Sequence, residues 1–294
     1  MHIHFFKASS RLGLAHIPNK SHEVNIGVED GPDAVLSPAF LSQLQSNYSM
    51  SHFQFSAPES VPKEVFMETL ARESDLFTRQ INDQLRPDQI QVVLGGDHSV
   101  AFCSILALLR RLPAESTFAS IHFDSHGDLH LLRTSPSGNF HGMWARALTT
   151  GIGEPSIDAL VGRHLDPHSI TFYGNLDLED EELKYIHDNH MAVWSKSDII
   201  ADPESALSHV RSLVSQYDHI HVSFDIDVFD ARLAPATGTP APDGLDPEHV
   251  FPLLEEFAEA KNISVDLVEV NPHKPGAGKT IELAQKVIET LLHI

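Results

Sequence analysis

Cysteine is almost absent from this 294-residue chain, in which Cys103 is the only example. No internal disulfide bond can form, and the apolar neighbours of Cys103 predict a buried packing role rather than a reactive thiol. Residues 1–10 also lack the basic segment, apolar stretch and cleavage site of a secretory signal. We therefore expect a protein of the reducing cytoplasm.

Positive charge and long apolar runs are scarce as well. The chain has 20 Lys and Arg residues against 41 Asp and Glu residues, which gives a formal net charge of -21. Such an acidic chain is a poor candidate for binding nucleic acid or an anionic membrane surface. No apolar run approaches the length of a transmembrane helix. We therefore predict no nucleic-acid partner and no membrane partner.

Strands and helices are expected to alternate along most of the chain. Hydrophobic residues make up 41% of it, which is enough for a substantial core. The alternation predicts an α/β fold with a mostly parallel sheet covered by helices on both faces. The expected strands are 90–94, 118–123, 170–173, 191–194, 219–224 and 263–270. The expected helices are 62–84, 99–112, one starting at Asp180, 203–216, 247–261 capped by Asp246, and 280–292. Residues 27–38 are expected to form a loop, with a helix following toward residue 45.

Acidic residues and histidines recur where the expected strands end. The carboxyl ends of parallel strands meet at one edge of a sheet, and ligands bind beyond that edge. Clustered anionic groups repel one another and burial raises their free energy further, so a divalent cation among them would relieve both costs. The sequence therefore predicts a metalloenzyme with two metals. The strings in question are Asp97-His98, Asp124 to Asp128, Asp225 to Asp227, and Glu269.

The spacing within two of these strings supports the metal hypothesis. In an extended backbone, Asp124, His126 and Asp128 would all point to one side, and Asp225 and Asp227 alternate in the same way. A polar loop of capping residues explains one aspartate easily, but not three aligned side chains. Carboxylates with one imidazole per ion suit a hard or borderline metal such as Mn²⁺, whereas a structural zinc site would be expected to use thiolates.

Three other strings allow a plain structural interpretation beside a functional one. Residues 95–99 could be a strand-to-helix turn capped by Asp97, but the neighbouring strings favour a metal role for His98. Residues 135–142 could be a connector, or a substrate-holding loop in which His141 transfers protons. Residues 276–280 resemble the end of a phosphate-binding loop. However, His273 stands where that motif needs its first glycine, so we interpret them as a loop into a helix.

Together, several strings resemble the motifs of the ureohydrolase family, which comprises arginases, agmatinases, formimidoylglutamases and their relatives. A further string, Gly-Val-Glu-Asp-Gly-Pro at 27–32, also looks familial. Several independent motifs in the right order make the resemblance specific. The main strings are Gly-Gly-Asp-His-Ser at 95–99, Asp-Ser-His-Gly-Asp at 124–128, Ser-Phe-Asp-Ile-Asp at 223–227, Pro-Ala-Thr-Gly-Thr-Pro at 235–240 and Val-Glu-Val-Asn-Pro at 268–272.

This resemblance implies a three-layer α/β/α fold, one domain over residues 1–294, and a binuclear manganese centre. A hydroxide between two Mn²⁺ ions would attack a guanidinium carbon, because two metals lower the pKa of bound water. Matched motif by motif, His98 and Asp128 would hold one ion, His126 and Asp227 the other, and Asp124 and Asp225 would bridge them.

The same matching implies the catalytic residues. Glu269 would pair with the guanidinium of the substrate, and His141 would shuttle protons. We count both as candidate catalytic residues, together with the metal ligand Asp128. The family resemblance also implies a homo-oligomer, either a trimer or a hexamer.

Within the family the chain is most similar to arginases, which implies hydrolysis of L-arginine to L-ornithine and urea. The Ser137-Gly138-Asn139 string is the pattern that arginases use for the substrate α-carboxylate. Ser125 and Gly127 depart from the family's usual alanine and threonine, and His130 stands where arginases often have asparagine. Residues 174–180 match the α-amino segment loosely. The candidate substrate-binding residues are Ser137, Asn139, His130, Glu179, Asp180 and Thr239.

Two kinds of alternative stay open. The substrate could be agmatine, guanidinobutyrate or formimidoylglutamate instead of arginine. The chain could also be a binding or regulatory homologue that has kept its metal ligands. The complete ligand set, together with His141 and Glu269, favours the enzyme.

Overall fold

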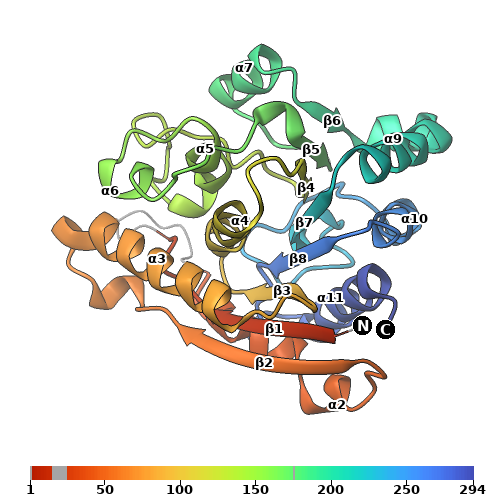
Figure 1. Cartoon of the computed structure of the whole chain (residues 1–294), viewed down its shortest axis with the longest axis horizontal. Helices are drawn as coiled ribbons and strands as arrows, with labels where there is room; N and C mark the ends of the chain where they lie inside the picture. Colours follow the sequence, from red (N-terminus) through yellow and green to blue (C-terminus); the bar gives the residue numbers. More distant parts are fainter. Residues whose placement is uncertain (1, 15–24, 175) are drawn as a thin grey trace.

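The computed structural model describes residues 2–14, 25–174 and 176–294. Among these residues, eight strands form one central sheet. The strands are β1 (His2–Ser9), β2 (Asn47–Gln54), β3 (Gln89–Gly95), β4 (Phe118–Phe123), β5 (Ile170–Tyr173), β6 (Ala192–Trp194), β7 (His219–Asp225) and β8 (Ile263–Val268). Their order across the sheet is β2-β1-β3-β8-β7-β4-β5-β6. Every neighbouring pair is parallel (Figure 1).

Helices surround this sheet. The α-helices are α1 (Gly31–Val35), α2 (Pro38–Leu41), α3 (Phe66–Gln84), α4 (Val100–Arg111), α5 (Trp144–Thr149), α6 (Pro155–Asp158), α7 (Asp180–Asp188), α8 (Lys196–Ala201), α9 (Pro203–Gln216), α10 (Pro247–Ala258) and α11 (Ala277–Leu292). Short 3-10 helices are η1 (Val28–Asp30), η2 (Pro58–Ser60), η3 (Lys63–Val65), η4 (Phe140–Gly142), η5 (Pro167–Ser169) and η6 (Ile226–Val228). Figure 1 shows α9, α10 and α11 on one side of the sheet and α3 and α4 on the other.

Two hydrophobic clusters, one on each face of the sheet, confirm the predicted three-layer α/β/α architecture. Successive strand side chains point to opposite faces. Accordingly, Phe5 belongs to the cluster that includes residues of α9, α10 and α11, whereas Phe6 belongs to the cluster that includes residues of α3, α4 and α5. Val92 and Val93 divide between the two clusters in the same way. Each such fully buried side chain contributes roughly 1.5–3 kcal/mol relative to an exposed one.

The N-terminal part of the chain differs most from expectation. The sequence pattern does not predict β1 or β2, and β2 lies at the sheet edge with Tyr48 and Met50 exposed. In β2 the apolar Tyr48 and Met50 are exposed while Ser49 and Ser51 are half-buried, so the pattern of apolar residues does not mark a buried face. The expected loop at residues 27–38 is wrong, because that segment contains η1 and α1.

Two expectations about element ends also need correction. Strand β8 ends at Val268 rather than at residue 270, because Glu269 adopts a left-handed φ of 66° that a strand cannot continue through. Asp246 stands at the N-cap position of α10, but its side chain makes no capping hydrogen bond. Its Oδ2 lies instead 3.5 Å from Nζ of Lys196.

The strand order explains why the polar strings meet. Strands β3, β8, β7 and β4 are consecutive neighbours in the middle of the sheet, so the residues that follow them converge at one edge. This is where parallel α/β sheets bind ligands. In the part of the chain that the structure describes, no helix has the length and apolar character needed to cross a membrane.

Gly96 is a position where the fold leaves no space for a side chain. A Cβ atom there would lie 1.8 Å from the carbonyl oxygen of Ser10. The backbone N–H of Asp97 donates to that same oxygen at 3.0 Å. The turn that carries His98 is therefore pressed directly against the segment after β1.

We expect Gly96→Ala to destabilise the protein, because either the turn or the segment after β1 must move. The loss should be on the order of 1–3 kcal/mol in the free energy of unfolding, as for overpacked sites, and denaturant unfolding would measure it. Gly278→Ala in α11 is the matched control, since nothing lies within 4 Å of its Cβ position. An unchanged stability of Gly96→Ala would contradict this account of the turn.

Candidate metal centre

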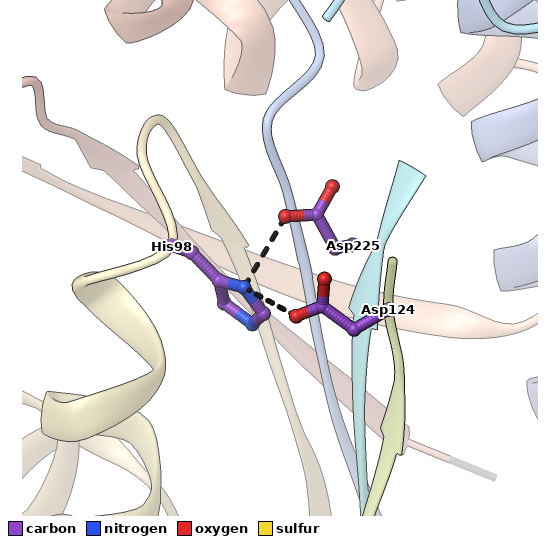
Figure 2. A group of neighbouring side chains, drawn as sticks. All are labelled: His98, Asp124 and Asp225. Carbon is purple, nitrogen blue, oxygen red and sulfur yellow. Dashed lines mark ion pairs between the residues drawn. The ribbon is translucent and has the colours of Figure 1, made fainter. Parts of the chain in front are cut away.

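His98 faces three carboxylates at the carboxyl end of the sheet. It follows β3, while Asp124 follows β4 and Asp225 ends β7. The Nδ1 atom of His98 lies 3.1 Å from Oδ2 of Asp124 and 3.2 Å from Oδ2 of Asp225 (Figure 2). Oδ2 of Asp128 lies 3.0 Å from the same nitrogen. All four side chains are buried.

His126 forms a second group beside the first. Its Nδ1 lies 3.2 Å from Oδ2 of Asp227 and 3.5 Å from Oδ1 of Asp124. Asp124 therefore lies between the two imidazoles, with one oxygen toward each. One ligand atom from each of His98, Asp124 and Asp225 lies within 4.8 Å of the others, and the same holds for Asp124, His126 and Asp227.

Tight turns, rather than an extended backbone, bring these side chains to one side. The backbone N–H of His126 donates to Oδ1 of Asp124 at 2.8 Å, and that of Asp227 donates to Oδ1 of Asp225 at 2.9 Å. Asp128 has a left-handed φ of 52°, and η6 follows Asp225. The alternation in the sequence thus marks carboxylates that bond to the N–H two residues on, which differs from the expected extended segment.

The charges in the two groups strongly perturb one another. Burial works to lower the pKa of His98 and His126, but the neighbouring aspartates raise both pKa values well above the ordinary range. Burial and the charges of Asp227 and Asp124 raise the pKa of Asp225 well above its usual value. Burial opposes ionisation of Asp124, but the two imidazoles lower its pKa.

This donor set fits divalent cations. Two imidazolium groups could offset only two of the four carboxylates of Asp124, Asp128, Asp225 and Asp227, whereas two divalent ions would offset all four. Imidazole nitrogens with carboxylate oxygens are the ligands of hard or borderline metals. The structure thus contains a buried His and Asp cluster that could hold metal.

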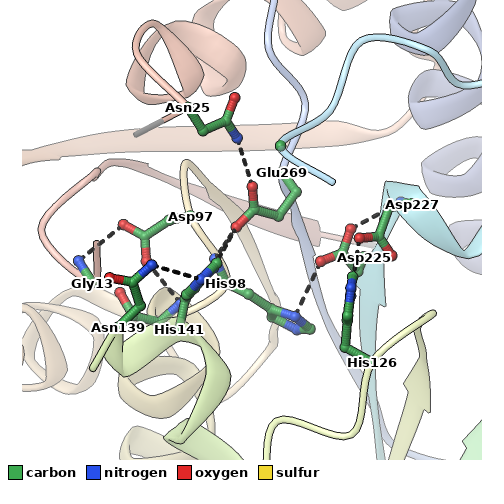
Figure 3. Close-up of polar contacts among 12 residues, drawn as sticks. Gly13, Asn25, Asp97, His98, His126, Asn139, His141, Asp225, Asp227 and Glu269 are labelled. Carbon is green, nitrogen blue, oxygen red and sulfur yellow. Dashed lines mark hydrogen bonds and ion pairs between the residues drawn. The ribbon is translucent and has the colours of Figure 1, made fainter. Parts of the chain in front are cut away.

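Glu269 places a further carboxylate beside this cluster. Its Oε1 accepts the backbone N–H of His98 at 2.9 Å, and its Oε2 accepts from Nδ2 of Asn25 at 2.7 Å (Figure 3). Burial works to raise the pKa of Glu269, but His141 and the His98 N–H lower it. The result is a buried anion that stays ionised, with a fixed orientation. Nδ2 of Asn271 holds Asn25 in turn, donating to its Oδ1 at 2.8 Å.

His141 lies next to Glu269 and remains in contact with solvent. Its side chain is 28% exposed, and its Nδ1 lies 3.4 Å from Oε1 of Glu269. Burial lowers the pKa of His141, but Glu269 raises it above the ordinary value. The backbone N–H groups of Phe140 and His141 both donate to the carbonyl of Gly13. An ionisable group with a fixed backbone and solvent access can exchange protons with water.

Asp97 anchors this arrangement and does not face the cluster. It accepts hydrogen bonds from the hydroxyl of Ser10 at 3.0 Å, from the N–H of Gly13 at 3.2 Å and from the N–H of Ser99 at 2.9 Å. Figure 3 shows its contact with Gly13. Asp97 and His98 thus have different roles. Asp97 binds the N–H of Gly13, whose carbonyl accepts from the backbone of His141, while His98 faces the carboxylates.

A cavity of about 550 Å³ opens over the cluster. His130 lies in its wall with Nε2 2.9 Å from Oε2 of Glu179 and 3.4 Å from Oε2 of Glu182. No lysine or arginine is among the described residues that line it, so its charge is strongly negative. Such a cavity favours cationic ligands. The predicted site residues in its wall are His98, His126, Asp128, His130, Ser137, Asn139, His141, Glu179, Asp225, Asp227, Thr239 and Glu269.

One predicted substrate-binding residue lies outside the cavity, and several residues that line the cavity are not predicted from the sequence. Asp180 is exposed in the first turn of α7 and is not among the lining residues. Asn25, Asp177 and Glu182 do line the cavity. Asn25 precedes the familial string at 27–32, which was its only signal in the sequence. Nothing distinguishes Glu182 from the other acidic residues of α7. Trp144, also not predicted, donates its indole N–H to Oδ2 of Asp128 at 2.6 Å.

Comparisons with known proteins identify the family and the fold. The model of the arginase family matches residues 11–293. An arginase of Bacillus subtilis is 32% identical over 226 residues, which is 74% of each chain. The crystal structure of Entamoeba histolytica arginase in complex with L-ornithine has a TM-score of 0.86 at 25% identity, and the match covers 100% of this chain and 98% of that one. A formimidoylglutamase of B. subtilis, at 17% identity, a TM-score of 0.73 and coverage of 99% and 86%, shares the fold.

The family match over nearly the whole chain, the ureohydrolase strings and the buried His and Asp cluster lead to one assignment. The chain belongs to the arginase family and is a hydrolase of this family's kind, acting on linear amidines.

Proposed function

We propose that the chain is a manganese-dependent arginase, which hydrolyses L-arginine to L-ornithine and urea. The observation that carries the proposal is the acidic cavity over two His and Asp groups that share Asp124. A cavity of this charge suits the guanidinium cation, and the relative from E. histolytica was crystallised with L-ornithine. The proposal treats residues 1–294 as one catalytic domain, because the site combines residues from both ends of the chain.

In this proposal two Mn²⁺ ions occupy the cluster. His98 and Asp128 would hold one ion and His126 and Asp227 the other, with Asp124 and Asp225 shared. Only Asp124 belongs to both groups by its present distances, so the shared role of Asp225 requires its carboxylate to reach both ions. The bound ions would supply a water of lowered pKa, available as a nucleophile near neutral pH.

The protein's own groups would bind the guanidinium and handle protons. Glu269 is an ionised carboxylate whose orientation is fixed by two hydrogen bonds, so it can pair with the planar cation. His141 can deliver a proton to the leaving amine, because it lies beside Glu269 and is partly exposed to water. The absence of basic side chains from the described cavity wall avoids repulsion of the substrate.

The outer part of the cavity suits the zwitterionic end of an amino acid. Ser137 and Asn139 offer a hydroxyl, an amide and backbone N–H groups to a carboxylate, with Thr239 nearby in the cavity wall. Glu179 offers an acceptor for an α-ammonium group. Nε2 of His130 lies 2.9 Å from Oε2 of Glu179. A bound amino acid could replace this contact, with its α-ammonium group on Glu179 and its carboxylate near His130. Because Asp180 does not line the cavity, we leave it out of the proposed subsite.

The single most informative experiment is a urea assay with purified protein and Mn²⁺. It should compare L-arginine with agmatine and guanidinobutyrate, and an assay for formamide or glutamate should test formimidoylglutamate. Fastest turnover of L-arginine is the expected result. Faster turnover of another compound would reassign the substrate within the family. A protein that binds Mn²⁺ but hydrolyses none of them would be the binding or regulatory homologue.

We expect two Mn²⁺ ions per chain, and Asp225→Ala should lose at least one, because this residue would be shared between the ions. Metal analysis after gel filtration measures the content directly. Asp230→Asn is a matched control, since Asp230 is also buried and follows β7 but pairs with Arg232. Retention of both ions by Asp225→Ala would rule out its role as a ligand.

Removing metal should lower the melting temperature. The empty cluster holds four mutually repulsive carboxylates, and an ion that binds only the folded state stabilises it by about 2.7 kcal/mol at a hundred times its Kd. For a chain of this size that corresponds to roughly 5 °C or more. Calorimetry with chelator, and again after Mn²⁺ is restored, measures the shift. Identical curves after verified metal removal would contradict the proposal.

Asn139→Ala should weaken arginine turnover and leave the metals in place. Without the amide, the α-carboxylate of bound arginine lacks one hydrogen-bond donor, which costs on the order of 1–3 kcal/mol. The kcat/KM for L-arginine should therefore fall about ten- to a hundredfold. Agmatine lacks the carboxylate, so its slower turnover should be the same in the variant and the wild type. An equal loss for both compounds would show that Asn139 does not recognise the carboxylate.

A further inference from the structure

A chain of buried polar residues leads away from His98 between β7 and β8. Nε2 of His98 lies 3.0 Å from Oγ of Ser223, which donates its hydrogen to Oδ1 of Asp266 at 2.7 Å. Oδ2 of Asp266 lies 2.7 Å from Nε2 of His221. Nδ1 of His221 lies 2.8 Å from Oγ of Ser264. These residues are completely buried, apart from His98 at 2% exposure.

The chain continues to the opposite end of β7. Oγ of Ser264 lies 2.9 Å from Nε2 of His219, the first residue of that strand. Because β7 and β8 are paired in parallel register, Ser223 lies opposite Asp266 and His221 opposite Ser264. The register of the two strands therefore builds the chain, and its members line one face of the sheet.

The hydrogens in this chain have one consistent direction. An ionised Asp266 can only accept, so Ser223 gives it its single O–H hydrogen. The contact between Ser223 and Nε2 of His98 then needs a hydrogen on that nitrogen. Nδ1 is then the nitrogen available to a cation that binds among the carboxylates of Asp124 and Asp225. A metal ion bound there needs this tautomer of His98, with its hydrogen on Nε2.

We infer that Asp266 is a positioning residue for the metal centre, which acts through Ser223 to hold His98 in its metal-binding tautomer. The inference rests on the proposed metal centre and adds to it a residue that touches no ion. The effect of Asp266 should fall mainly on the ion that His98 binds, rather than on the ion that His126 binds. Within the described residues, no comparable hydrogen bond to Nε2 of His126 is seen, and that side chain is 33% exposed.

Asp266→Asn tests the inference with Mn²⁺ alone. An amide can donate to Ser223, which could then donate to Nε2 of His98 and shift its hydrogen to Nδ1. The affinity for one of the two Mn²⁺ ions should fall about 10- to 100-fold, as for other residues that support metal ligands. Titration against a competing chelator measures both affinities, and electron paramagnetic resonance should show the coupled pair replaced by a single ion.

Two further variants separate positioning from plain structural damage. Ser223→Ala should weaken the same ion, and the double variant with Asp266→Asn should lose little more, because both changes break one chain. Ser264→Ala is the matched control. It is equally buried but lies beyond Asp266, so Mn²⁺ affinity should stay within about twofold. If Asp266→Asn does not fold, Ser223→Ala still carries the test.

The outcomes are distinct. Wild-type affinity for both ions in Asp266→Asn or, where that variant does not fold, in Ser223→Ala would overturn the inference. An equal loss of Mn²⁺ affinity in Ser264→Ala would also overturn it, since any change among the buried polar residues between β7 and β8 would then have the same effect. A wild-type protein that binds no Mn²⁺ would instead refute the proposed metal centre itself. Melting curves of the metal-free variants show how much of any change is structural.

Discussion

Mutual repulsion among four buried carboxylates is the constraint on which the site depends. Asp124, Asp128, Asp225 and Asp227 converge beyond the central strands, and two imidazoles cannot offset their charge. The fold holds them in place with backbone N–H groups, an indole N–H and packed strands. A divalent cation turns this repulsion into attraction. The stability of this edge and its chemistry are therefore coupled.

The supporting residues form two separate systems around the cluster. One runs beneath it, between β7 and β8, and ends on Nε2 of His98. The other lies above it, where Asp97 fastens Gly13 and the carbonyl of Gly13 fastens the backbone of His141. The first system concerns which nitrogen faces the carboxylates. The second concerns where a proton-carrying group stands relative to Glu269. Both join segments that are distant in the chain.

The cavity's charge and the family assignment point to the same class of ligand. Its described wall carries histidines and carboxylates but no lysine or arginine, so a cation is attracted and an anion must rely on dipoles from Ser137 and Asn139. His130 stands where arginases often have asparagine, and it pairs with Glu179 in the cavity wall. This pair is therefore a feature in which the chain departs from the arginase pattern.

The sequence by itself determined the α/β class, most strands and helices from residue 89 onward, and the residues of the cluster. It could do so because strand ends and apolar periodicity are local patterns, and because parallel strands bring their ends to one edge. It missed β2, whose apolar Tyr48 and Met50 do not lie on its half-buried face, and Asn25, which only the neighbouring familial string marks. Only the tertiary structure decided that Asp97 anchors a loop while His98 faces carboxylates. It also decided that Asp266 reaches His98 through Ser223, because those contacts depend on the register of β7 against β8, two strands that are separated in the chain and meet only in the folded sheet.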